Sequence, residues 1–391
     1  MPSFDVIIIG AGAAGLMCAM TAGSRGRRVL LLDRGPEPGA KILISGGGRC
    51  NFTNLHAAAD RFLSNNPHFC KSALSRYSQH DFIALIEKHG IAYHEKTLGQ
   101  LFCDGPARQV VAMLLAECHA AGVEVRLGQR ITDIVKADRF HLSADQGAFE
   151  SPALVMASGG LSIPKMGATG FAHDMARRFG LGLVEPRPGL VPLTASEEDL
   201  ALIRPLAGIS FDAVVSHGRP AFREKMLFTH RGLSGPAILQ ISSYWQGGGP
   251  IAIDMLPDQD VAALLRDRRH ARPKAEPQTV LAECLPARLA RALAARLLPD
   301  RPMGSLSDRA LDTAAAALKT WSFTPAGTEG YAKAEVTVGG IDTADLSSRT
   351  MEARKVPGLY FIGEAVDVTG WLGGYNFQWA WSSGWCAGMA V

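Results

Sequence analysis

The chain has 391 residues, of which 47% are hydrophobic and 20% charged, a composition typical of globular proteins rather than of disordered or fibrous ones. Its formal net charge of +3 is too small to indicate nucleic-acid binding by itself. The seven cysteines form no Cys-x-x-Cys pair, and no apolar run reaches the ~18 residues that cross a bilayer. We therefore expect a cytoplasmic protein with reduced thiols, two or three domains, no metal site and no membrane contact.

The N-terminal residues predict one βαβ unit. Residues 4–9 form an apolar run typical of a strand buried in a parallel sheet, and a glycine-rich turn follows. Small and apolar residues at 16–24 predict a helix. Residues 29–32 predict a second buried strand that ends at Asp33.

The turn between the first strand and the helix carries the pattern Gly10-Ala-Gly12-Ala-Ala-Gly15. In this context the pattern is a dinucleotide-binding fingerprint. Gly10 permits the tight turn, Gly12 lets the backbone approach a pyrophosphate, and Gly15 lets the helix pack closely on the sheet. The helix N-terminus attracts the anion, and Asp33 can accept hydrogen bonds from a ribose.

Residues 42–54 are glycine-rich and polar, so we predict a loop there. Gly46, Gly47 and Gly48 leave backbone N–H groups uncovered, and Arg49 supplies positive charge. Such a loop suits the flavin and diphosphate of FAD, although a surface linker would have the same composition. Further along the chain, helices are expected at 80–89 and 107–121, and strands at 123–127, 130–137, 140–144 and 154–157.

The sequence pattern changes near residue 189. From there on, prolines separate short runs in which apolar and polar residues alternate, such as 213–216 and 251–255. Residues 258–321 are helical in pattern, with Leu285, Leu289, Leu293 and Leu297 spaced four apart. We predict a discontinuous FAD-binding domain at 1–188 and 333–391. A β-rich substrate domain is expected at 189–257 and 322–332, and a helical subdomain at 258–321.

Two apolar strands, at 333–338 and 359–362, return the chain to the first domain. The glycine turn at 372–374 then opens a helix that runs through Trp385. A helix N-terminus reached through glycines can stabilise negative charge on a reduced flavin. An ordinary C-terminal docking helix would show the same pattern, and its tryptophans are expected in the core or at an interface.

Five segments together carry a family resemblance, namely residues 5–19, 41–54, 157–170, 334–341 and 358–384. They resemble the bacterial NAD(P)/FAD-dependent oxidoreductases known as bile-acid-reductase-like or aminoacetone-oxidase-like flavoproteins, and more distantly the fumarate reductase flavoprotein superfamily. The resemblance implies an α/β fold: a glutathione-reductase-like Rossmann FAD domain with an inserted β-rich domain and a helical subdomain. It covers nearly the whole chain, and its most specific motifs are SGGGRCN at 45–51 and the tail around 370–376.

Residues matching the family's flavin contacts are Gly10, Gly12, Gly15, Asp33, Lys41, Ser45, Gly47, Arg49, Cys50, Asn51, Ala157, Gly159, Gly363, Gly374, Asn376 and Phe377. The predicted cofactor site also includes their neighbours Ala13, Ala14, Arg34, Gly46, Gly48, Thr53, Ser158, Gly160, Glu364 and Tyr375.

This chain departs from the family pattern at two places. Residues 99–103 read Gly-Gln-Leu-Phe-Cys where the family often has Gly-Arg-x-Phe-Pro, and Leu161 replaces a common lysine. Both changes affect the substrate side of the site, so the substrates of the family are a poor guide to the substrate of this chain. Cys50 has no second cysteine nearby in the sequence, so we interpret it as a packed small residue rather than a redox thiol. The basic cluster at 266–274 is interpreted as a solvated loop rather than a phosphate-binding patch.

These features predict an enzyme in which non-covalent FAD supplies the chemistry. The leading hypothesis is a reductase of a C=C bond conjugated to a carbonyl, driven by NAD(P)H that docks transiently, because the chain has one fingerprint only. A small-molecule substrate between flavin and inserted domain is expected. The alternatives are an oxidase of small amines or aminoketones, a reductase of uracil in RNA, which the charge does not favour, and a non-catalytic redox sensor. No catalytic acid or base and no oligomeric state is predicted.

Overall fold

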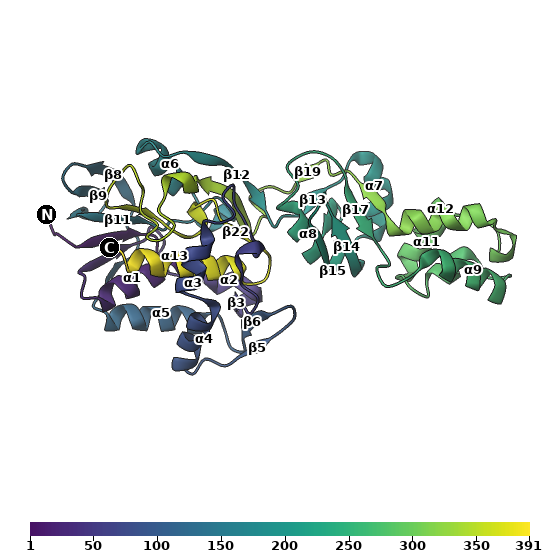
Figure 1. Ribbon diagram of the computed structural model, residues 1–391, viewed down its shortest axis with the longest axis horizontal. Coiled ribbons are helices and arrows are strands. Elements are labelled where there is room, and N and C mark those ends of the chain that lie inside the picture. The colour runs from purple at the N-terminus through teal and green to yellow at the C-terminus, as the bar shows by residue number, and fades with distance from the viewer. The chain divides into compact units, whose positions relative to one another are not determined.

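The computed structural model describes residues 1–391 and divides into two compact units. The discontinuous unit contains residues 1–188 and 335–391, and the inserted unit contains residues 189–334. The ribbon colours in Figure 1 show that the first and last parts of the chain share one unit.

The discontinuous unit is built on a five-stranded parallel sheet with the order β21-β11-β1-β2-β7. Every residue of β1, β2, β11 and β21 is buried, which explains why these strands read as continuous apolar runs. Its strands are β1 (Val6–Ile9), β2 (Val29–Leu32), β7 (Glu124–Arg126), β11 (Ala153–Met156) and β21 (Leu359–Phe361).

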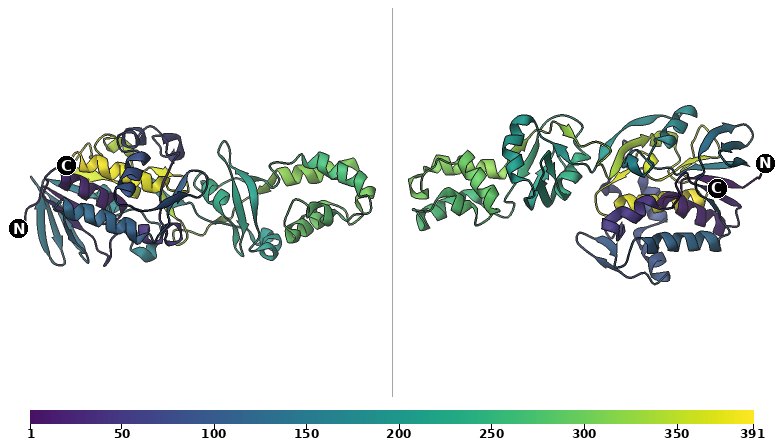
Figure 2. Two further views of the ribbon diagram at one scale, coloured as in Figure 1. Left: turned by 90° about the horizontal axis from the view of Figure 1, so that it is seen from below. Right: turned by 180° about the vertical axis from the view of Figure 1, so that it is seen from behind.

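Three helices of this unit, α1 (Ala13–Ser24), α5 (Arg108–Ala120) and α13 (Tyr375–Gly388), lie side by side (Figure 2). Helix α13 approaches α1 very closely at two glycines. A Cβ atom added to Gly384 would lie 2.5 Å from the carbonyl oxygen of Ala14, and one added to Gly388 would lie 2.7 Å from that of Cys18. The C-terminal helix therefore packs backbone against backbone.

Smaller sheets and helices surround this layer. The strands that pair are β3 (Asn51–Asn54), β6 (Gln100–Cys103) and β5 (Tyr93–Glu95); β10 (Gly147–Ser151), β9 (Phe140–Ala144) and β8 (Ile131–Lys136); β22 (Thr369–Gly370) with β4 (Phe62–Leu63); and β12 (Leu183–Gly189) with β20 (Val336–Ile341). The remaining α-helices are α2 (Ala40–Gly48), α3 (Cys70–Arg76), α4 (Gln79–Lys88) and α6 (Phe171–Arg178).

The inserted unit contains a seven-stranded antiparallel sheet with the order β18-β17-β14-β15-β16-β13-β19. Its strands are β13 (Leu193–Thr194), β14 (Ser210–Ser216), β15 (Ala221–Phe228), β16 (Gly232–Ser234), β17 (Ile251–Asp254), β18 (Trp321–Phe323) and β19 (Gly327–Thr328). Helices α7 (Glu197–Ile203) and α8 (Pro236–Ser242) belong to the same unit.

A helical segment joins two neighbouring strands of this sheet. It consists of α9 (Val261–Ala271), α10 (Pro277–Leu281), α11 (Ala287–Leu297) and α12 (Asp308–Lys319). Strands β17 and β18, on either side of it in the sequence, pair with each other. The helical segment therefore forms the long connection between two strands that pair directly with each other.

The α/β fold class predicted from the sequence is confirmed, and several local predictions are wrong. Residues 42–54 are not a loop throughout: α2 is helical until Ser45, whose φ of −65° and ψ of 148° break it, and β3 follows. The cluster at 266–274 lies mostly in helix α9 rather than in a loop. Strand β20 begins at Val336, later than the predicted 333. No helix in the chain is long and apolar enough to span a membrane.

The α1–α13 contact makes a prediction in which two effects oppose each other. Gly384→Ala should favour the helical state by ~1 kcal/mol through helix propensity. The new Cβ would meet the Ala14 carbonyl at 2.5 Å, and such overpacking costs ~1–3 kcal/mol. We expect a net loss of stability, measured as a lower midpoint of thermal unfolding. A raised midpoint would show that the helices can separate without cost.

Candidate functional site

The fingerprint glycines have three different environments. Gly10 has a φ of +114°, and an added Cβ would lie 2.4 Å from the carbonyl oxygen of Ala157. At Gly15 the added atom would lie 1.8 Å from the Gly10 carbonyl oxygen. At Gly12, by contrast, no protein atom lies within 4 Å of the added Cβ. Gly10 and Gly15 are thus required by the fold, whereas Gly12 leaves space at the start of α1.

Helix α1 begins at Ala13, and no side chain caps its N-terminus. The free N–H groups and the positive end of the helix dipole at Ala13 and Ala14 suit an anion such as a pyrophosphate. Asp33 lies beside this turn. One of its carboxylate oxygens accepts a hydrogen bond from the Ala11 N–H at 2.6 Å and the other from the Gly35 N–H at 2.7 Å. These bonds fix the orientation of the carboxylate, while the neighbouring Arg34 is exposed.

After the helical start of α2, the backbone turns through three left-handed glycines. Gly46, Gly47 and Gly48 have φ values of +58°, +68° and +85°. An added Cβ at Gly47 would meet nothing within 4 Å, so this turn is open on one side. Cys50 has a φ of +50°, a conformation that is uncommon for residues other than glycine and that stores strain. The strained segment contains the exposed Arg49.

The C-terminal tail closes onto this turn. Gly374, which precedes α13, has a φ of +96°, and an added Cβ would lie 2.3 Å from the carbonyl oxygen of Thr53. The Asn51 amide, in the orientation that satisfies its hydrogen bonds, accepts from the Gly374 N–H at 3.3 Å. Thr53 donates from its hydroxyl to Gln378 at 2.7 Å. The two glycine-rich stretches, far apart in sequence, are therefore neighbours.

The first residues of α13 serve mainly to hold this turn. The Asn376 side chain accepts from the Gly370 N–H at 2.8 Å and donates to the Gly370 carbonyl at 2.9 Å. Phe377 stacks on Trp381, with ring centroids 5.6 Å apart, and Tyr375 is buried. These three predicted cofactor residues thus have structural partners within the protein.

The turn after β11 contains a buried polar atom without a partner. The Ser158 hydroxyl oxygen is buried and makes no hydrogen bond within the protein. Beside it, an added Cβ at Gly159 would meet nothing within 4 Å, whereas at Gly160 it would lie 2.4 Å from the Thr337 hydroxyl oxygen. An unpartnered buried hydroxyl is costly, so a bound group that hydrogen-bonds Ser158 would be stabilised here.

A partly buried ion pair links four segments around Glu364. The Lys41 ammonium lies 2.5 Å from one carboxylate oxygen of Glu364, and Ser162 donates to the other oxygen at 2.6 Å. The hydroxyl and the N–H of Thr337 also donate to Glu364, each at 3.0 Å. Lys41 donates to the Ser162 hydroxyl at 2.6 Å. The network links α2, the turn after β11, β20 and the Gly363 turn.

The protonation state of Glu364 follows from this network. Burial by itself raises the pKa of the carboxyl, but the Lys41 charge and the hydrogen bonds from Ser162 and Thr337 outweigh it and hold the pKa below its ordinary value. His173 is buried close by, and burial lowers the pKa of its imidazole. Its Nε2 atom has no hydrogen-bond partner.

Cys50 is fully buried, and burial raises the pKa of its thiol to about 12. This state favours the packed residue expected from the sequence over a reactive thiolate. However, Cys103 lies across from it where β3 pairs with β6, and burial raises the pKa of that thiol to about 11. Because Cys50 and Cys103 are far apart in the sequence, their proximity follows only from the pairing of the two strands.

Sequence reasoning missed Ser162, Thr337, Gln378 and His173, all of which contact predicted site residues or lie beside them. Ser162, Thr337 and Gln378 lie within the segments that carry the family resemblance, but no sequence pattern signals which partner each of them contacts. Gln100, one of the residues that differ from the family pattern, lies at the edge of the site, because an added Cβ at Gly373 would lie 2.8 Å from the Gln100 side chain. Leu161 donates from its backbone N–H to the Thr337 hydroxyl at 2.8 Å, a contact independent of its side chain.

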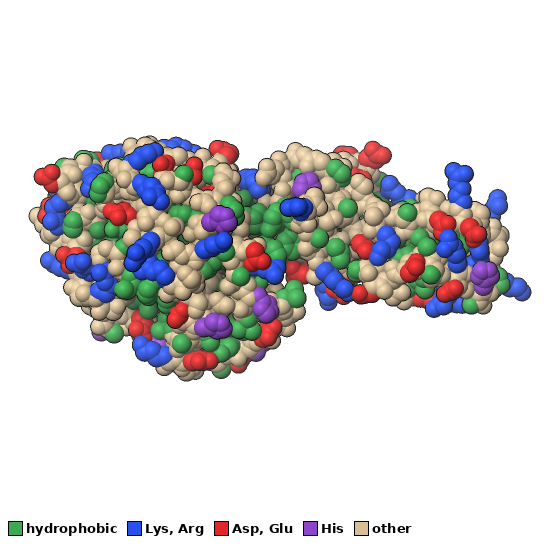
Figure 3. Space-filling view, in the orientation of Figure 1, with side chains coloured by type: hydrophobic (Ala, Val, Ile, Leu, Met, Phe, Trp, Pro, Cys, Tyr) green, Lys and Arg blue, Asp and Glu red, His purple; other side chains and the backbone are tan.

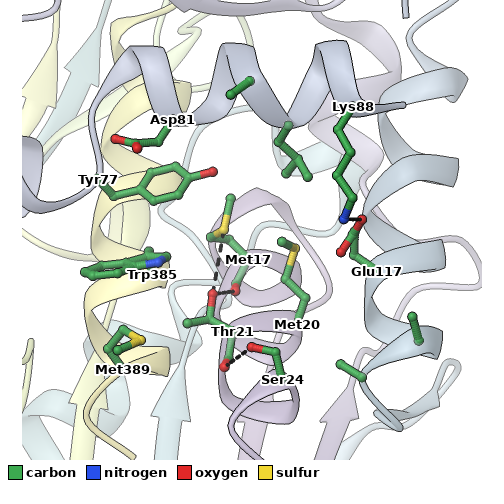
Figure 4. A pocket seen from close by; sticks show the side chains of 14 residues that line it. Met17, Met20, Thr21, Ser24, Tyr77, Asp81, Lys88, Glu117, Trp385 and Met389 are labelled. Carbon is green, nitrogen blue, oxygen red and sulfur yellow. Dashed lines mark hydrogen bonds and ion pairs between the residues drawn. The ribbon is translucent and has the colours of Figure 1, made fainter. Parts of the chain in front are cut away.

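A separate groove of about 570 Å³ lies on the discontinuous unit, among α1, α4, α5 and α13 (Figure 4). Met17, Met20, Tyr77, Trp385 and Met389 line it, and the Tyr77 hydroxyl points into it. Met20 lies in the second half of α1, and Trp385 and Met389 lie at the C-terminal end of α13, away from Gly12 and Gly374. The groove is therefore not part of the fingerprint site.

The fingerprint, the acid at the end of β2 and the glycine turns at the ends of β1, β11 and β21 define a Rossmann-type dinucleotide-binding protein. Their location at the carboxyl ends of parallel strands is the usual ligand position in such sheets. The space at Gly12, Gly47 and Gly159 and the unpartnered Ser158 hydroxyl fit a long dinucleotide such as FAD. Residues 4–390 match the HI0933-like protein Rossmann domain model, and the chain belongs to this family.

Relatives cover the chain almost completely. A protein named ribosomal RNA dihydrouridine synthase from Escherichia coli is 54% identical over 391 residues, 99% of this chain and 98% of its own length. One of the same name from Haemophilus influenzae is 45% identical over 98% of both chains. A 3-dehydro-bile acid delta(4,6)-reductase from Clostridium scindens is 30% identical, again over 98% of each.

Among solved structures, a 3-ketosteroid-delta4-(5alpha)-dehydrogenase from Rhodococcus jostii matches with a TM-score of 0.51 and 14% identity, over 99% of this chain and 97% of that one. At this identity the match concerns the fold alone. It agrees with the α/β fold predicted from the sequence.

The contrast between Gly12 and Gly15 gives a testable pair of variants. Gly12→Ala should fold like the parent, because its Cβ meets no protein atom, but should lose most of its bound dinucleotide. Gly15→Ala should lower stability even without ligand, because its Cβ would overlap the Gly10 carbonyl oxygen. Cofactor content by absorbance and unfolding midpoints of cofactor-free protein measure the two effects. Equal midpoints for both variants would contradict this assignment.

Glu364 predicts a pH-dependent difference in stability. Its pKa in the folded state is below the unfolded value of about 4.3, so its contribution is present above that pH and is lost as the pH falls through the folded-state pKa. Glu364→Gln should cost ~1–3 kcal/mol near pH 7 and progressively less below pH ~4. Denaturant titrations at both pH values measure this difference. A constant difference across the range would exclude an ionised Glu364.

Proposed function

We propose that this chain is a FAD-dependent reductase that converts uridine in ribosomal RNA to dihydrouridine. The observation that carries the proposal is the 54% identity, over nearly the full length of both chains, to the Escherichia coli protein of that name. From the sequence alone a small-molecule substrate is favoured over RNA, and the net charge of +3 is too small to indicate nucleic-acid binding by itself. The full-length relatives support the RNA alternative instead, and a ribosomal substrate agrees with the expected cytoplasmic location.

The proposal preserves the reaction type expected from the sequence. The C5=C6 bond of uracil is conjugated to the C4 carbonyl, so it is an electron-poor double bond of the kind predicted. The bile-acid reductase relative is also named for the reduction of double bonds. Shared reaction chemistry with different substrates is consistent with one cofactor site and variable substrate contacts.

The residues that would hold FAD are those of the two glycine-rich turns. We assign the pyrophosphate to the α1 N-terminus at Gly12, and the adenosine ribose to the fixed carboxylate of Asp33. The open turn at Gly47 and the Gly374 turn would contact the flavin end. When bound non-covalently, FAD supplies the hydride-transfer chemistry, and NADH or NADPH is the proposed reductant.

The protein's own contribution is rigidity. Lys41 and Glu364 hold the α2 segment, the turn after β11 and the Gly363 turn in fixed positions. A cofactor bound to several turns keeps its orientation only if those turns keep theirs. We therefore treat Lys41 and Glu364 as positioning residues.

The direct test uses purified protein and ribosomal RNA from a strain that lacks the corresponding gene. Heat should release FAD rather than FMN. With NADPH or NADH, anaerobic incubation should convert uridine to dihydrouridine, detected by mass spectrometry as a gain of two hydrogens. Gly12→Ala provides the matched control, because it should fold and yet be inactive.

Other outcomes would redirect the assignment. Peroxide formation with an aminoketone, without a response to either nicotinamide, would indicate an oxidase. Reduction of an isolated enone without any change in RNA would indicate a small-molecule reductase. The absence of turnover with every donor and acceptor pair tested would indicate a sensor.

A further inference from the structure

The two groups of arginines in the helical segment of the inserted unit differ in their partners. The cluster on α9 that stands out in the sequence is engaged in ion pairs. Arg266 pairs with Asp312 at 2.5 Å, Arg269 with Asp308 at 2.7 Å, and Arg268 and Arg272 both pair with Glu283 at 2.6 Å. These arginines connect α9 to its neighbours, and their charge is largely compensated.

Helix α11 has the opposite character. It contains Arg288, Arg291 and Arg296 and no acidic residue. All three arginines are exposed, and none forms an ion pair. Arg288 donates to the carbonyl oxygens of Pro205 and Ala207, which hold its side chain but do not neutralise it. Of the six lysine and arginine side chains of this segment without an ion pair, three are therefore on α11, and the others, Lys274, Arg301 and Arg309, are spread over three other places in the sequence.

The rest of the helix explains how the arginines are presented. Leu289, Ala290, Leu293 and Ala294 are buried, and α11 packs against α10 and α12. Its exposed half carries the arginines with the small side chains Ala287 and Ala295. Figure 3 shows Lys and Arg side chains projecting from the surface of this segment. A face of arginines separated by alanines lets a charged surface approach the helix closely.

We propose that the exposed face of α11 binds the sugar-phosphate backbone of the RNA substrate. This inference rests on the proposed function. Guanidinium groups bind phosphates through two parallel hydrogen bonds. The distance along the helix from Arg288 to Arg296 is about 12 Å, which corresponds to roughly three or four phosphates along one strand. The face presents no aromatic side chain, so it contacts phosphates rather than stacking on bases.

The test compares two triple variants with equal loss of charge. One is Arg288→Ala, Arg291→Ala and Arg296→Ala on α11. The matched control is Lys71→Ala, Arg130→Ala and Arg349→Ala, three exposed basic residues of the discontinuous unit without ion pairs. Both are prepared as holoenzyme and compared with the parent by unfolding midpoint and by the rate of flavin reduction with NADPH, which should not change.

Binding to a ribosomal RNA fragment is then measured from 50 to 300 mM salt. The α11 variant should bind at least ten-fold more weakly at low salt, and the slope of log affinity against log salt should fall by about two to three. The control should keep the parent's slope. Replacing the three arginines with lysine should restore most of the slope, because the charge returns, and this variant also tests whether weak binding reflects misfolding.

Each result is decisive for the α11 face. Equal weakening by both alanine variants would reduce the effect to net charge and overturn the proposal, and so would an unchanged α11 variant. Normal binding to free RNA with lost binding to intact ribosomal subunits would assign the face to a protein partner instead. If the parent itself neither binds RNA nor forms dihydrouridine, the proposed function fails, which is distinguishable because the variants then have no parent activity to lose.

Discussion

Helix α1 is held in place by contacts between backbone atoms that only glycine permits. Gly15 lies against the Gly10 carbonyl, Gly10 lies against Ala157, and Gly384 of α13 lies against Ala14. These contacts set the position of the helix relative to β1, β11 and α13 at once. Gly12, between two of these contacts in the sequence, has no protein atom within 4 Å of an added Cβ. The dinucleotide site is thus a consequence of close packing around one helix rather than of a flexible loop.

Much of this arrangement could be predicted from local sequence. The βαβ unit, the buried parallel strands and the start of α13 follow from apolar runs and glycine positions, whose physical causes are local. The segment at 42–54 was predicted less well, because Ser45 and Cys50 adopt conformations that depend on tertiary neighbours. The Lys41–Glu364 pair could not be predicted at all. Its partners are separated by most of the chain, and neither residue type indicates which opposite charge it meets.

Electrostatics in the inserted unit illustrates the same limit. The sequence draws attention to the dense basic run of α9, yet Glu283, Asp308 and Asp312 from other segments compensate most of its charge. The charges of the sparser arginines of α11 are uncompensated, because no carboxylate lies within ion-pair distance of them. Local charge density is therefore a poor guide to surface potential, which depends on the acids that tertiary structure brings near.

The order of strands in the parallel sheet has a consequence for synthesis of the protein. Strand β11 can pair with β1 early, but its other edge waits for β21, which follows the whole inserted unit in the sequence. At elongation rates of about 5–20 residues per second, the ribosome needs roughly 10–40 s to make the intervening residues. During that interval the free edge of β11 and the surface of α1 that α13 later covers stay exposed. An exposed apolar strand edge can pair with another chain, so the interval before β21 is made is the period in which the nascent chain is most open to aggregation.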